Sequence, residues 1–400
     1  MLLGRSFRLL ALLACLPSCK RPAPVAPTDA GFGVATTTQG DAAAPLPPRC
    51  VDAKSFGLDG TAVEYGEAVA TASRVFVGAT YEKGGKRHAA ILSFRREGDT
   101  VLDLTTEDAG DLAPDAPPPK VALVGDTARA ATYPPAKDAR EIAFDGSRIK
   151  TQKDESFAFD LAVRPSGEGL IVWDEDAPAA ARGVIKAAVL PYDGKVAPLV
   201  VSPDSTDAET PRVALRTGGY VVAWIARKPE LVDAAPEREG PGLGRKLAWL
   251  ETMMLDAKGN VVGTPSRHVR AGSRVEAFDM SSHDDTLEVL VKDDEQPADN
   301  AGSRLMLLTL RGEEARWSVV IADGVGSGVP DLLGTWAAFR DSQDQARLVP
   351  LAPGGRASTE PAFSGGRPLA ALGDRILAGF PSDPARAVRL LSCGEALGKQ

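Results

Sequence analysis

The chain has 400 residues and a formal net charge of −8, with 54 acidic and 46 basic side chains. A net acidic chain lacks the positive surface by which proteins bind phosphate backbones, so we expect no nucleic-acid partner. The part after residue 49 is long enough to bury a large core. It contains no apolar run of the length that crosses a bilayer.

Residues 1–18 have the pattern of a secretory signal peptide. Arg5 and Arg8 precede an apolar run over 9–16, which is too short to span a membrane and typical of a signal-peptide core. The run ends in Leu16-Pro17-Ser18-Cys19. This box resembles the lipobox of bacterial lipoprotein precursors, although Pro17 departs from the commonest form.

The resemblance implies that Cys19 carries a lipid anchor, with a diacylglyceryl thioether and an amine acylated by a fatty acid such as palmitate. It implies a membrane partner and a place in the bacterial cell envelope. Because Lys20 and not Asp follows the cysteine, it points to the outer membrane, on its periplasmic or surface face. Two alternatives stay open: a rival box at 12–15, and an ordinary cleaved signal peptide.

Residues 19–49 predict a disordered tether. They are rich in Pro, Ala and Thr and have almost no large apolar side chain, so they cannot bury enough surface to fold. A segment of about 30 such residues reaches on the order of 30 Å. The folded domain, 50–400, would therefore stand away from the membrane.

One short apolar strand motif recurs at a spacing of roughly 50 residues. Its clearest form is Gly219–Trp224, a strand of the fully buried kind that ends in an aromatic residue. The copies are Leu170–Trp173, Gly334–Phe339, Ile376–Phe380, Val75–Tyr81, Ala130–Tyr133 and, without the aromatic residue, Leu287–Val291. A strand repeat of this length indicates a propeller or a solenoid.

Each copy lies in a larger unit of four predicted strands. One strand precedes it, as in Pro119–Leu123 and Pro211–Leu215, and a third follows, as in Val184–Leu190. After a turn at Asp193-Gly194, Val196–Val201 continues as a fourth. About seven such units resemble a β-propeller. We predict an all-β, seven-bladed β-propeller of four-stranded antiparallel blades, with six or eight blades as alternatives; paired β-sandwiches would not explain a repeat sustained along the chain.

The two ends of the folded part are expected to meet. The last unit lacks a fourth strand, and the segment from Cys50 to Phe56 has no partner of its own. We expect the N-terminal strand to complete the last blade, which would place Cys50 beside Cys393. With Cys15 removed and Cys19 lipidated, these two remain, and the compartment permits a disulfide; two free buried thiols are the alternative.

No catalytic or metal-binding motif stands out. His88, His268 and His283 fall in different repeats, and no two have the spacing of metal ligands. We therefore assign no catalytic residue, no metal ligand and no cofactor.

Acidic side chains are concentrated between predicted strands. The expected loops span 105–118, 174–182, 225–246 and 292–302, and we place them on one face of the propeller. The candidate residues for a binding face are Asp174, Glu175, Asp176, Asp293, Asp294 and Glu295. Such a face would suit a basic partner or a cation such as Ca²⁺, whereas the simpler interpretation is that charged loops keep the protein soluble.

Two functions follow as hypotheses. The first is a lipid-anchored binding or scaffolding module that contacts a protein or a glycan through its acidic loop face, with no catalysis. The alternative is a propeller-type hydrolase or lyase that uses carboxylates at the mouth of the central channel, which at this stage is an analogy of fold. Acids with strongly perturbed pKa values around a channel would favour the second hypothesis.

Overall fold

The computed structural model describes residues 50–393, except for 59, 137–139, 153–156, 178–181, 229–246, 271–273, 284, 295–302, 313, 319–320 and 352–361. The chain divides into two compact units, Met1–Pro45 and Leu46–Gln400. All described residues belong to the second unit, so the predicted signal peptide, tether and lipid attachment at Cys19 lie outside them. Within the described residues, no helix is long and apolar enough to cross a membrane.

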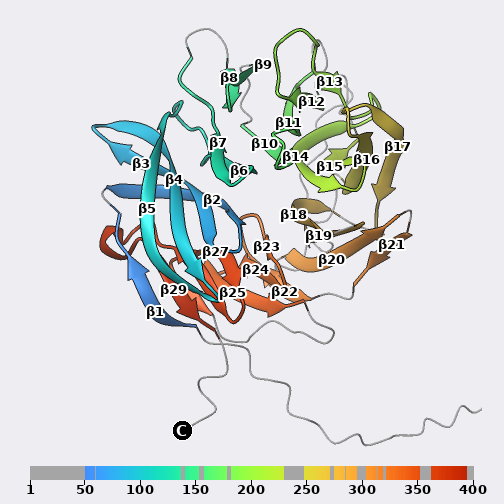
Figure 1. Ribbon diagram of the computed structural model, residues 1–400. Helices are drawn as coiled ribbons and strands as arrows, with labels where there is room; N and C mark the ends of the chain where they lie inside the picture. Colours follow the sequence, from blue (N-terminus) through green and yellow to red (C-terminus); the bar gives the residue numbers. More distant parts are fainter. Residues whose placement is uncertain are drawn as a thin grey trace, which may run out of the picture. The chain divides into compact units, whose positions relative to one another are not determined.

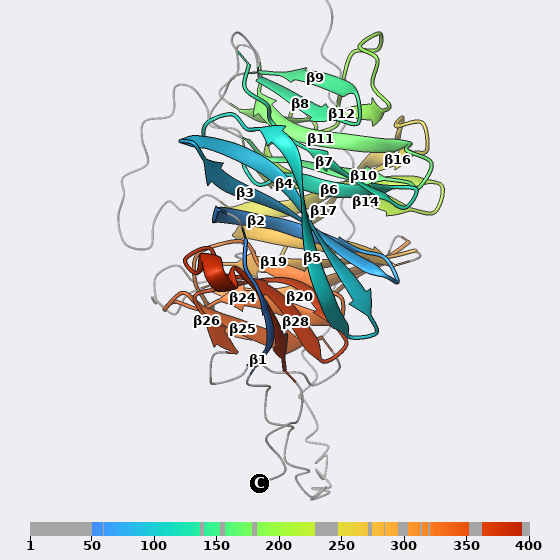
Figure 2. The same ribbon diagram turned by 60° about the vertical axis from the view of Figure 1, so that its left-hand side comes forward.

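The second unit consists of antiparallel sheets that follow one another along the chain (Figures 1 and 2). Four of them have four strands in sequence order. Their strands are β2 (Thr61–Ala70), β3 (Arg74–Lys83), β4 (Lys86–Glu97) and β5 (Thr100–Asp111); β10 (Phe159–Val163), β11 (Gly169–Asp176), β12 (Gly183–Leu190) and β13 (Leu199–Val200); β14 (Asp207–Arg216), β15 (Gly219–Arg227), β16 (Ala248–Asp256) and β17 (Val261–His268); and β23 (Asp331–Leu333), β24 (Trp336–Arg340), β25 (Gln345–Pro350) and β26 (Phe363–Ser364).

Two parts of the unit vary this plan. One sheet holds β18 (Val275–His283), β19 (Thr286–Asp293), β20 (Ser303–Arg311) and β21 (Glu314–Trp317), and a fifth strand, β22 (Ala322–Val325), also pairs with β20. Elsewhere two hairpins follow each other: β6 (Lys120–Val124) with β7 (Thr127–Ala131), and β8 (Arg140–Phe144) with β9 (Ser147–Thr151). An antiparallel bridge between Thr132 and Ala143 connects the two hairpins.

The last sheet contains both ends of the described chain. Its strand order is β1-β29-β28-β27, with β1 (Val51–Phe56), β27 (Arg367–Leu372), β28 (Arg375–Gly379) and β29 (Val388–Ser392); the 3₁₀ helix η1 (Pro384–Arg386) precedes β29. Val51 pairs with Ser392, and the adjacent Cys50 and Cys393 form a disulfide with their Cα atoms 4.2 Å apart. The predicted disulfide is confirmed, and the N-terminal strand does pair with the last strand.

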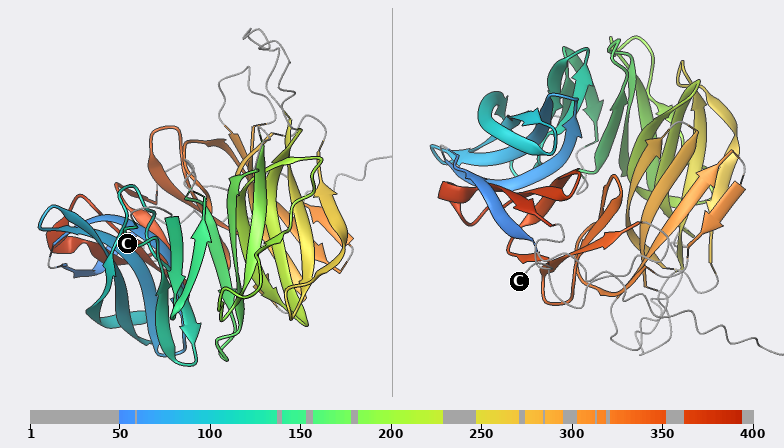
Figure 3. Two further views of the ribbon diagram at one scale, coloured as in Figure 1. Left: turned by 90° about the horizontal axis from the view of Figure 1, so that it is seen from above. Right: turned by 60° about the horizontal axis from the view of Figure 1, so that its bottom comes forward.

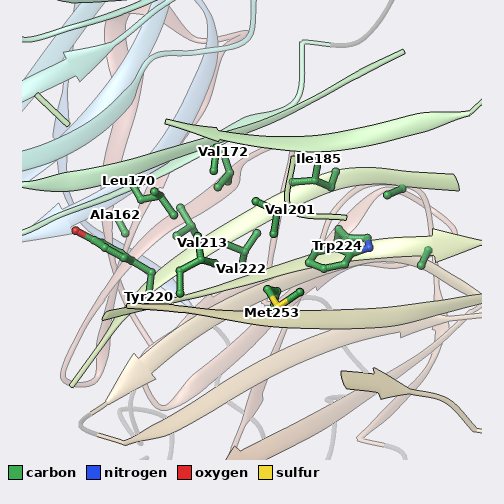
Figure 4. Packing of buried hydrophobic residues seen from close by; sticks show 14 of the residues in the cluster. Ala162, Leu170, Val172, Ile185, Val201, Val213, Tyr220, Val222, Trp224 and Met253 are labelled. Carbon is green, nitrogen blue, oxygen red and sulfur yellow. The ribbon is translucent and has the colours of Figure 1, made fainter. Parts of the chain in front are cut away.

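Consecutive sheets lie next to each other, as the two views of Figure 3 show, and apolar side-chain clusters join them. Figure 4 shows the one in which Leu170 and Val172 of β11 meet Tyr220, Val222 and Trp224 of β15. Another cluster joins β3 and β4 to β28 and β29, at the two ends of the chain. The repeated aromatic residues lie in this core, as predicted: Trp173, Trp224, Phe339 and Phe380 are 1, 0, 5 and 4 % exposed.

In every sheet except β8–β9, one edge strand, which we call the first strand, contacts the first strand of the next sheet. These contacts run from β2 to β6, β10, β14, β18, β23 and β27, and β27 contacts β2 in turn. The described elements are thus all β apart from η1, and the predicted all-β fold of four-stranded antiparallel sheets is confirmed.

Two expectations about strand extents were wrong. Residues 105–111 belong to the long strand β5, although their acidic composition favoured a loop. The predicted fourth strand over 196–201 is reduced to Leu199–Val200 in β13. The exposed residues of 105–111 are mostly polar, so they lack the apolar pattern on which a prediction of strands depends. The 196–201 segment is apolar, but Val196, Leu199 and Val200 are exposed and do not pack into the core.

Candidate functional site

The first strands share one feature that sets them apart from the rest of each sheet. Each contributes one charged side chain to a common group, which we call the charge cluster. Its members are Glu67 of β2, Lys120 of β6, Asp160 of β10, Arg212 of β14, Asp279 of β18, Asp331 of β23 and Arg367 of β27. Consecutive members are therefore held by consecutive sheets.

Ion pairs connect most of the cluster. Lys120 Nζ lies 2.8 Å from Glu67 Oε1 and 3.1 Å from Asp160 Oδ1. Arg212 pairs with the same Glu67 oxygen, and its Nη2 lies 3.9 Å from Asp279 Oδ1. Such pairing lets buried charges persist, because the Coulomb attraction offsets the loss of hydration.

The cluster also connects the backbones of neighbouring sheets. Asp160 Oδ2 accepts the N–H of Val213 at 2.9 Å, and Asp279 Oδ2 accepts the N–H of Leu332 at 2.8 Å. In both cases a carboxylate on one first strand binds the next first strand. Hydrogen bonds with a charged acceptor are stronger than neutral ones, so these carboxylates fix the first strands relative to each other.

β-bulges direct two members into the cluster. In β2, Tyr65 pairs with Ala79 and Ala68 with Val77, so two residues, one of them Glu67, stand opposite one. In β14 the pairing shifts in the same way just before Arg212. A bulge of one extra residue changes which face the following side chains occupy, and bulges are frequent beside functional sites.

The pKa values of the acids are pushed apart. Burial raises the pKa of the Asp279 carboxyl to about 7, with help from the Glu67 and Asp331 carboxylates and against the opposing effect of Arg212. Burial also acts to raise the pKa of Glu67, but Arg212 and Lys120 outweigh it and hold that pKa well below its usual range. Near neutral pH the cluster therefore contains an ionised Glu67 and an Asp279 able to hold a proton.

A cavity of about 450 Å³ lies against the cluster. One part of its described wall is apolar and includes Phe157, Phe159 and Val329, and Tyr133 packs edge-on against both phenyl rings. The charged part of the lining is Glu67, Lys120, Arg212, Asp331, Arg340 and Arg367. A concave site with an apolar wall and a few convergent polar groups is the usual form of a small-molecule site.

Charge in and behind this wall is balanced. The lining holds four basic and two acidic side chains, and the cluster places Asp160 and Asp279 next to Lys120 and Arg212. Four bases and four acids give a formal sum of 4 − 4 = 0 among these described residues. The site thus offers many donors and acceptors with little net charge.

The acidic residues expected on an exposed face lie elsewhere, and most are buried. Asp174, Glu175, Asp293 and Asp294 are 8, 4, 0 and 8 % exposed, at or just beyond the ends of β11 and β19. Asp176 is exposed at the end of β11, and Glu295 lies outside the described residues.

The buried acids are bonded inside the protein, which corrects the expectation of an exposed surface. Glu175 accepts the indole N–H of Trp173 at 3.2 Å and pairs with Lys186. Asp293 accepts the N–H of Arg274 at 2.8 Å. These carboxylates hold strand ends in place, because a buried acid needs partners of this kind.

The three histidines are dispersed. His88 Nδ1 lies 3.0 Å from Asp111 Oδ1, His268 contacts the hydroxyl of Thr252 at 2.9 Å, and burial lowers the pKa of His268. The described residues contain no group of three or more His, Cys, Asp or Glu side chains arranged to hold a metal ion.

Sequence reasoning missed the charge cluster, although one signal was present. Pro119-Lys120-Val121-Ala122-Leu123 and Pro211-Arg212-Val213-Ala214-Leu215 share a basic residue at the same place. A charge at a fixed position of a recurring buried strand implies a shared environment for that side chain. The acidic members have no common local sequence, so their place follows only from the strand pairing.

Comparisons with known proteins give likeness of structure alone. No family model matches the chain, and no curated protein matches it. Among solved structures, a prolyl endopeptidase matches with a TM-score of 0.47 and 13 % identity over 82 % of this chain and 50 % of its own. This chain thus spans about half the length of that protein.

Two further neighbours cover most of both chains. A neuraminidase-like protein from A/bat/Guatemala/164/2009 matches with a TM-score of 0.42 and 8 % identity over 86 % of this chain and 93 % of its own. A GH32 β-fructofuranosidase from Bombyx mori matches with a TM-score of 0.32 and 10 % identity over 87 % and 92 %. Such neighbours are proteins of β-propeller type, and at these values the likeness says nothing about activity.

Proposed function

We propose that the described domain is a closed, seven-bladed β-propeller. The contacts among first strands support this, because they return from β27 to β2. The bridge between the β6–β7 and β8–β9 hairpins supports counting them as one blade. The pairing of β1 with β29 and the disulfide beside it support closure through the last blade.

We propose that the cavity beside the charge cluster is the active site of a hydrolase that acts on a glycan. The observation that carries this proposal is the spread of acid pKa values. Asp279, raised to about 7, can hold a proton at neutral pH, while Glu67 is held ionised beside it. A pair of carboxyl groups in opposite states is what acid-assisted cleavage requires.

The charge balance favours a neutral, polyhydroxylated substrate. Each sugar hydroxyl both donates and accepts a hydrogen bond, so it needs the mixture of carboxylates and guanidinium groups found here. The Phe157 and Phe159 wall suits the apolar face of a sugar ring. A strongly anionic substrate would instead call for a clear excess of positive charge.

In the proposed reaction Asp279, which lies behind the cavity wall next to Arg212, passes its proton through one bridging water to the oxygen of the leaving group as the glycosidic bond breaks. Glu67, which lines the cavity and is held ionised by Arg212 and Lys120, takes a proton from the attacking water. The water oxygen forms the new bond to carbon, so the net change is addition of water. Arg212, which pairs with Glu67 and approaches Asp279, orients the two acids.

A binding module without catalysis is the second candidate function. The ion pairs that tie Lys120 and Arg212 to Glu67 favour it, because they also explain the cluster as a structural connection between sheets. The partner would then be a glycan or a protein. The acidic loop face gains no support, since most of its candidate residues are buried, and the described residues give a Ca²⁺ partner none either.

We also propose, on the sequence alone, that the protein is a lipoprotein of the bacterial envelope, held at the outer membrane through Cys19. Cys19→Ala should then move the protein from the membrane fraction to the soluble fraction. The mass of the mature N-terminus checks this, and an unmodified terminus at another residue would contradict it.

The enzymatic proposal is tested with the full chain against neutral and uronic-acid oligosaccharides, by release of reducing ends and by calorimetric binding. We expect cleavage of a neutral glycan, lost in Asp279→Asn with binding retained, because the amide oxygen still accepts the Leu332 N–H. Asp204→Asn, at a highly exposed carboxylate, is the matched control. Binding without cleavage by the unmodified protein would leave the binding module; absence of both would refute the site.

A further inference from the structure

Thr210 has a backbone conformation that its side chain disfavours. Its φ is +55°, in the left-handed region that β-branched residues rarely adopt. Thr210 and Pro211 are the two residues of β14 that stand opposite the single residue Trp224 of β15. Thr210 also lines the cavity beside the charge cluster. Strain of this kind persists only where surrounding structure imposes it.

The neighbouring sheet supplies a group that holds this conformation. Asp174 Oδ2, at the end of β11, accepts the N–H of Thr210 at 2.8 Å. Asp174 is only 8 % exposed, so little water competes for the bond. A carboxylate acceptor makes the bond stronger than a neutral one would.

The bulge at Thr210 decides which way Arg212 points. Before the bulge, Ala208 packs into the apolar cluster shared with the β10–β13 sheet, and after the bulge Val213 packs into the same cluster. Side chains alternate between the two faces of a strand, so without the bulge residues 208 and 213 would lie on opposite faces. Ala214 packs instead toward β18–β20. Arg212 stands two residues before Ala214 and therefore lies on the same face of β14, and it reaches Asp279 of β18.

We infer that Asp174 is a positioning residue for the charge cluster: by holding Thr210 in the left-handed conformation it fixes the bulge that turns Arg212 toward Glu67 and Asp279. The value of this device to the protein rests on the proposed function. Its test concerns the position of one guanidinium group and needs no substrate.

The position of Arg212 can be read from the titration of Asp279. The groups that act on this carboxyl are Glu67, Arg212, Asp331 and the Leu332 N–H, and Arg212 is the cation among them. If Asp174→Ala lets Arg212 move away, the midpoint of Asp279 should rise by about half a pH unit or more. Loss of the negative charge at Asp174 would by itself lower that midpoint, so a rise reports the displaced guanidinium.

The measurement is a carboxyl ¹³C NMR titration of the full chain, with Asp279→Asn to assign the signal. Thr210→Gly provides the decisive comparison, because glycine adopts a positive φ without strain. In a Thr210→Gly background, Asp174→Ala should leave the Asp279 midpoint near its value in the unmodified protein. Asp207→Ala is the matched control, since Asp207 also joins β14 to the β10–β13 sheet, through the Gly183 N–H at 2.6 Å, but lies outside the bulge.

A raised midpoint in Asp174→Ala that Thr210→Gly reverses would support the inference. An unchanged midpoint, or an equal rise with Asp207→Ala, would overturn it. If Asp174→Ala does not fold, recovery of folding with a normal midpoint in the double variant supports the inference, and failure of the double variant to fold contradicts it. Failure here would leave the proposed hydrolase intact, and lack of glycan cleavage would leave this inference intact.

Discussion

Arg212 and Glu67 form an ion pair between first strands whose residues lie 145 positions apart in the chain. Arg212 keeps only 12 % of its side-chain surface exposed, and Asp160 and Asp279 lie within 4.0 Å of its guanidinium nitrogens. One cation therefore serves three carboxylates on three other sheets. Its removal should affect stability more than the loss of any surface ion pair.

We predict that Arg212→Met lowers the free energy of unfolding by about 3 kcal/mol, the lower end of the range for breaking a buried pair. The lower end applies because Glu67 retains 37 % exposure and some hydration. Urea denaturation measures the change. Arg95→Met is the control: its pair with Asp103 is half exposed on both sides and should contribute under about 1 kcal/mol. Equal losses for the two variants would show that the cluster is not buried as described.

The second prediction concerns pH. The pKa of Asp279 is raised from 3.8 to about 7 on folding, so the folded state holds a proton that the unfolded state releases. The stabilisation by this proton is fully present below pH 4 and disappears as the pH rises through about 7. A three-unit shift corresponds to at most roughly 4 kcal/mol.

The difference in unfolding free energy between the unmodified protein and Asp279→Asn isolates this effect, because the asparagine does not titrate. We expect that difference to decline steadily from pH 4.5 to pH 7.5 in urea denaturation curves. Glu67 contributes the opposite trend to both proteins, since its pKa is lowered, and it largely cancels in the difference. A difference that is flat with pH would mean that Asp279 titrates normally.

The strand repeat could be predicted from the sequence because its signal is local. Pro211–Leu215, for example, was expected as a strand and lies within β14, since a buried first strand consists mostly of apolar residues whatever its partners are. Strand β5 was missed over 105–111 because its side chains there are mostly polar and exposed. An exposed edge strand is defined by its backbone pairing, which composition does not encode.

The candidate site was less predictable for a related reason. Asp174 was interpreted as an exposed loop acid, yet its carboxylate binds the backbone of β14. Sequence alone does not tell a carboxylate in water from one that accepts a buried N–H. Glu67 and Asp279 likewise meet only through sheet order and bulges, which are properties of the assembled fold.

The third prediction concerns the disulfide between Cys50 and Cys393. It closes a segment of 343 residues, so it restricts the unfolded chain strongly in the entropic account, and loss of such a bond typically costs roughly 2–5 kcal/mol. Cys50→Ser with Cys393→Ser should show a loss in this range in urea. Dithiothreitol should destabilise the unmodified protein equally and leave the double variant unaffected. No loss in the double variant would mean that the β1–β29 pairing holds the ends together without the bond.

The last prediction concerns Trp224, at the centre of the cluster in Figure 4. Its ring is fully buried between the β10–β13 and β14–β17 sheets, so Trp224→Ala should leave a large cavity and lower the free energy of unfolding by about 3–5 kcal/mol. Among the described residues its indole N–H has no acceptor.

Trp224→Phe keeps a ring in place and removes this unsatisfied donor, which is costly to bury, so it should cost only about 1–2 kcal/mol. Val196→Ala, at a side chain that is 75 % exposed, should change stability by less than about 0.5 kcal/mol. Urea denaturation of the three variants ranks their losses in the free energy of unfolding. If Trp224→Phe were as damaging as Trp224→Ala, the indole N–H would have a partner that stabilises the fold, and the packing of the ring would not be the main contribution of Trp224.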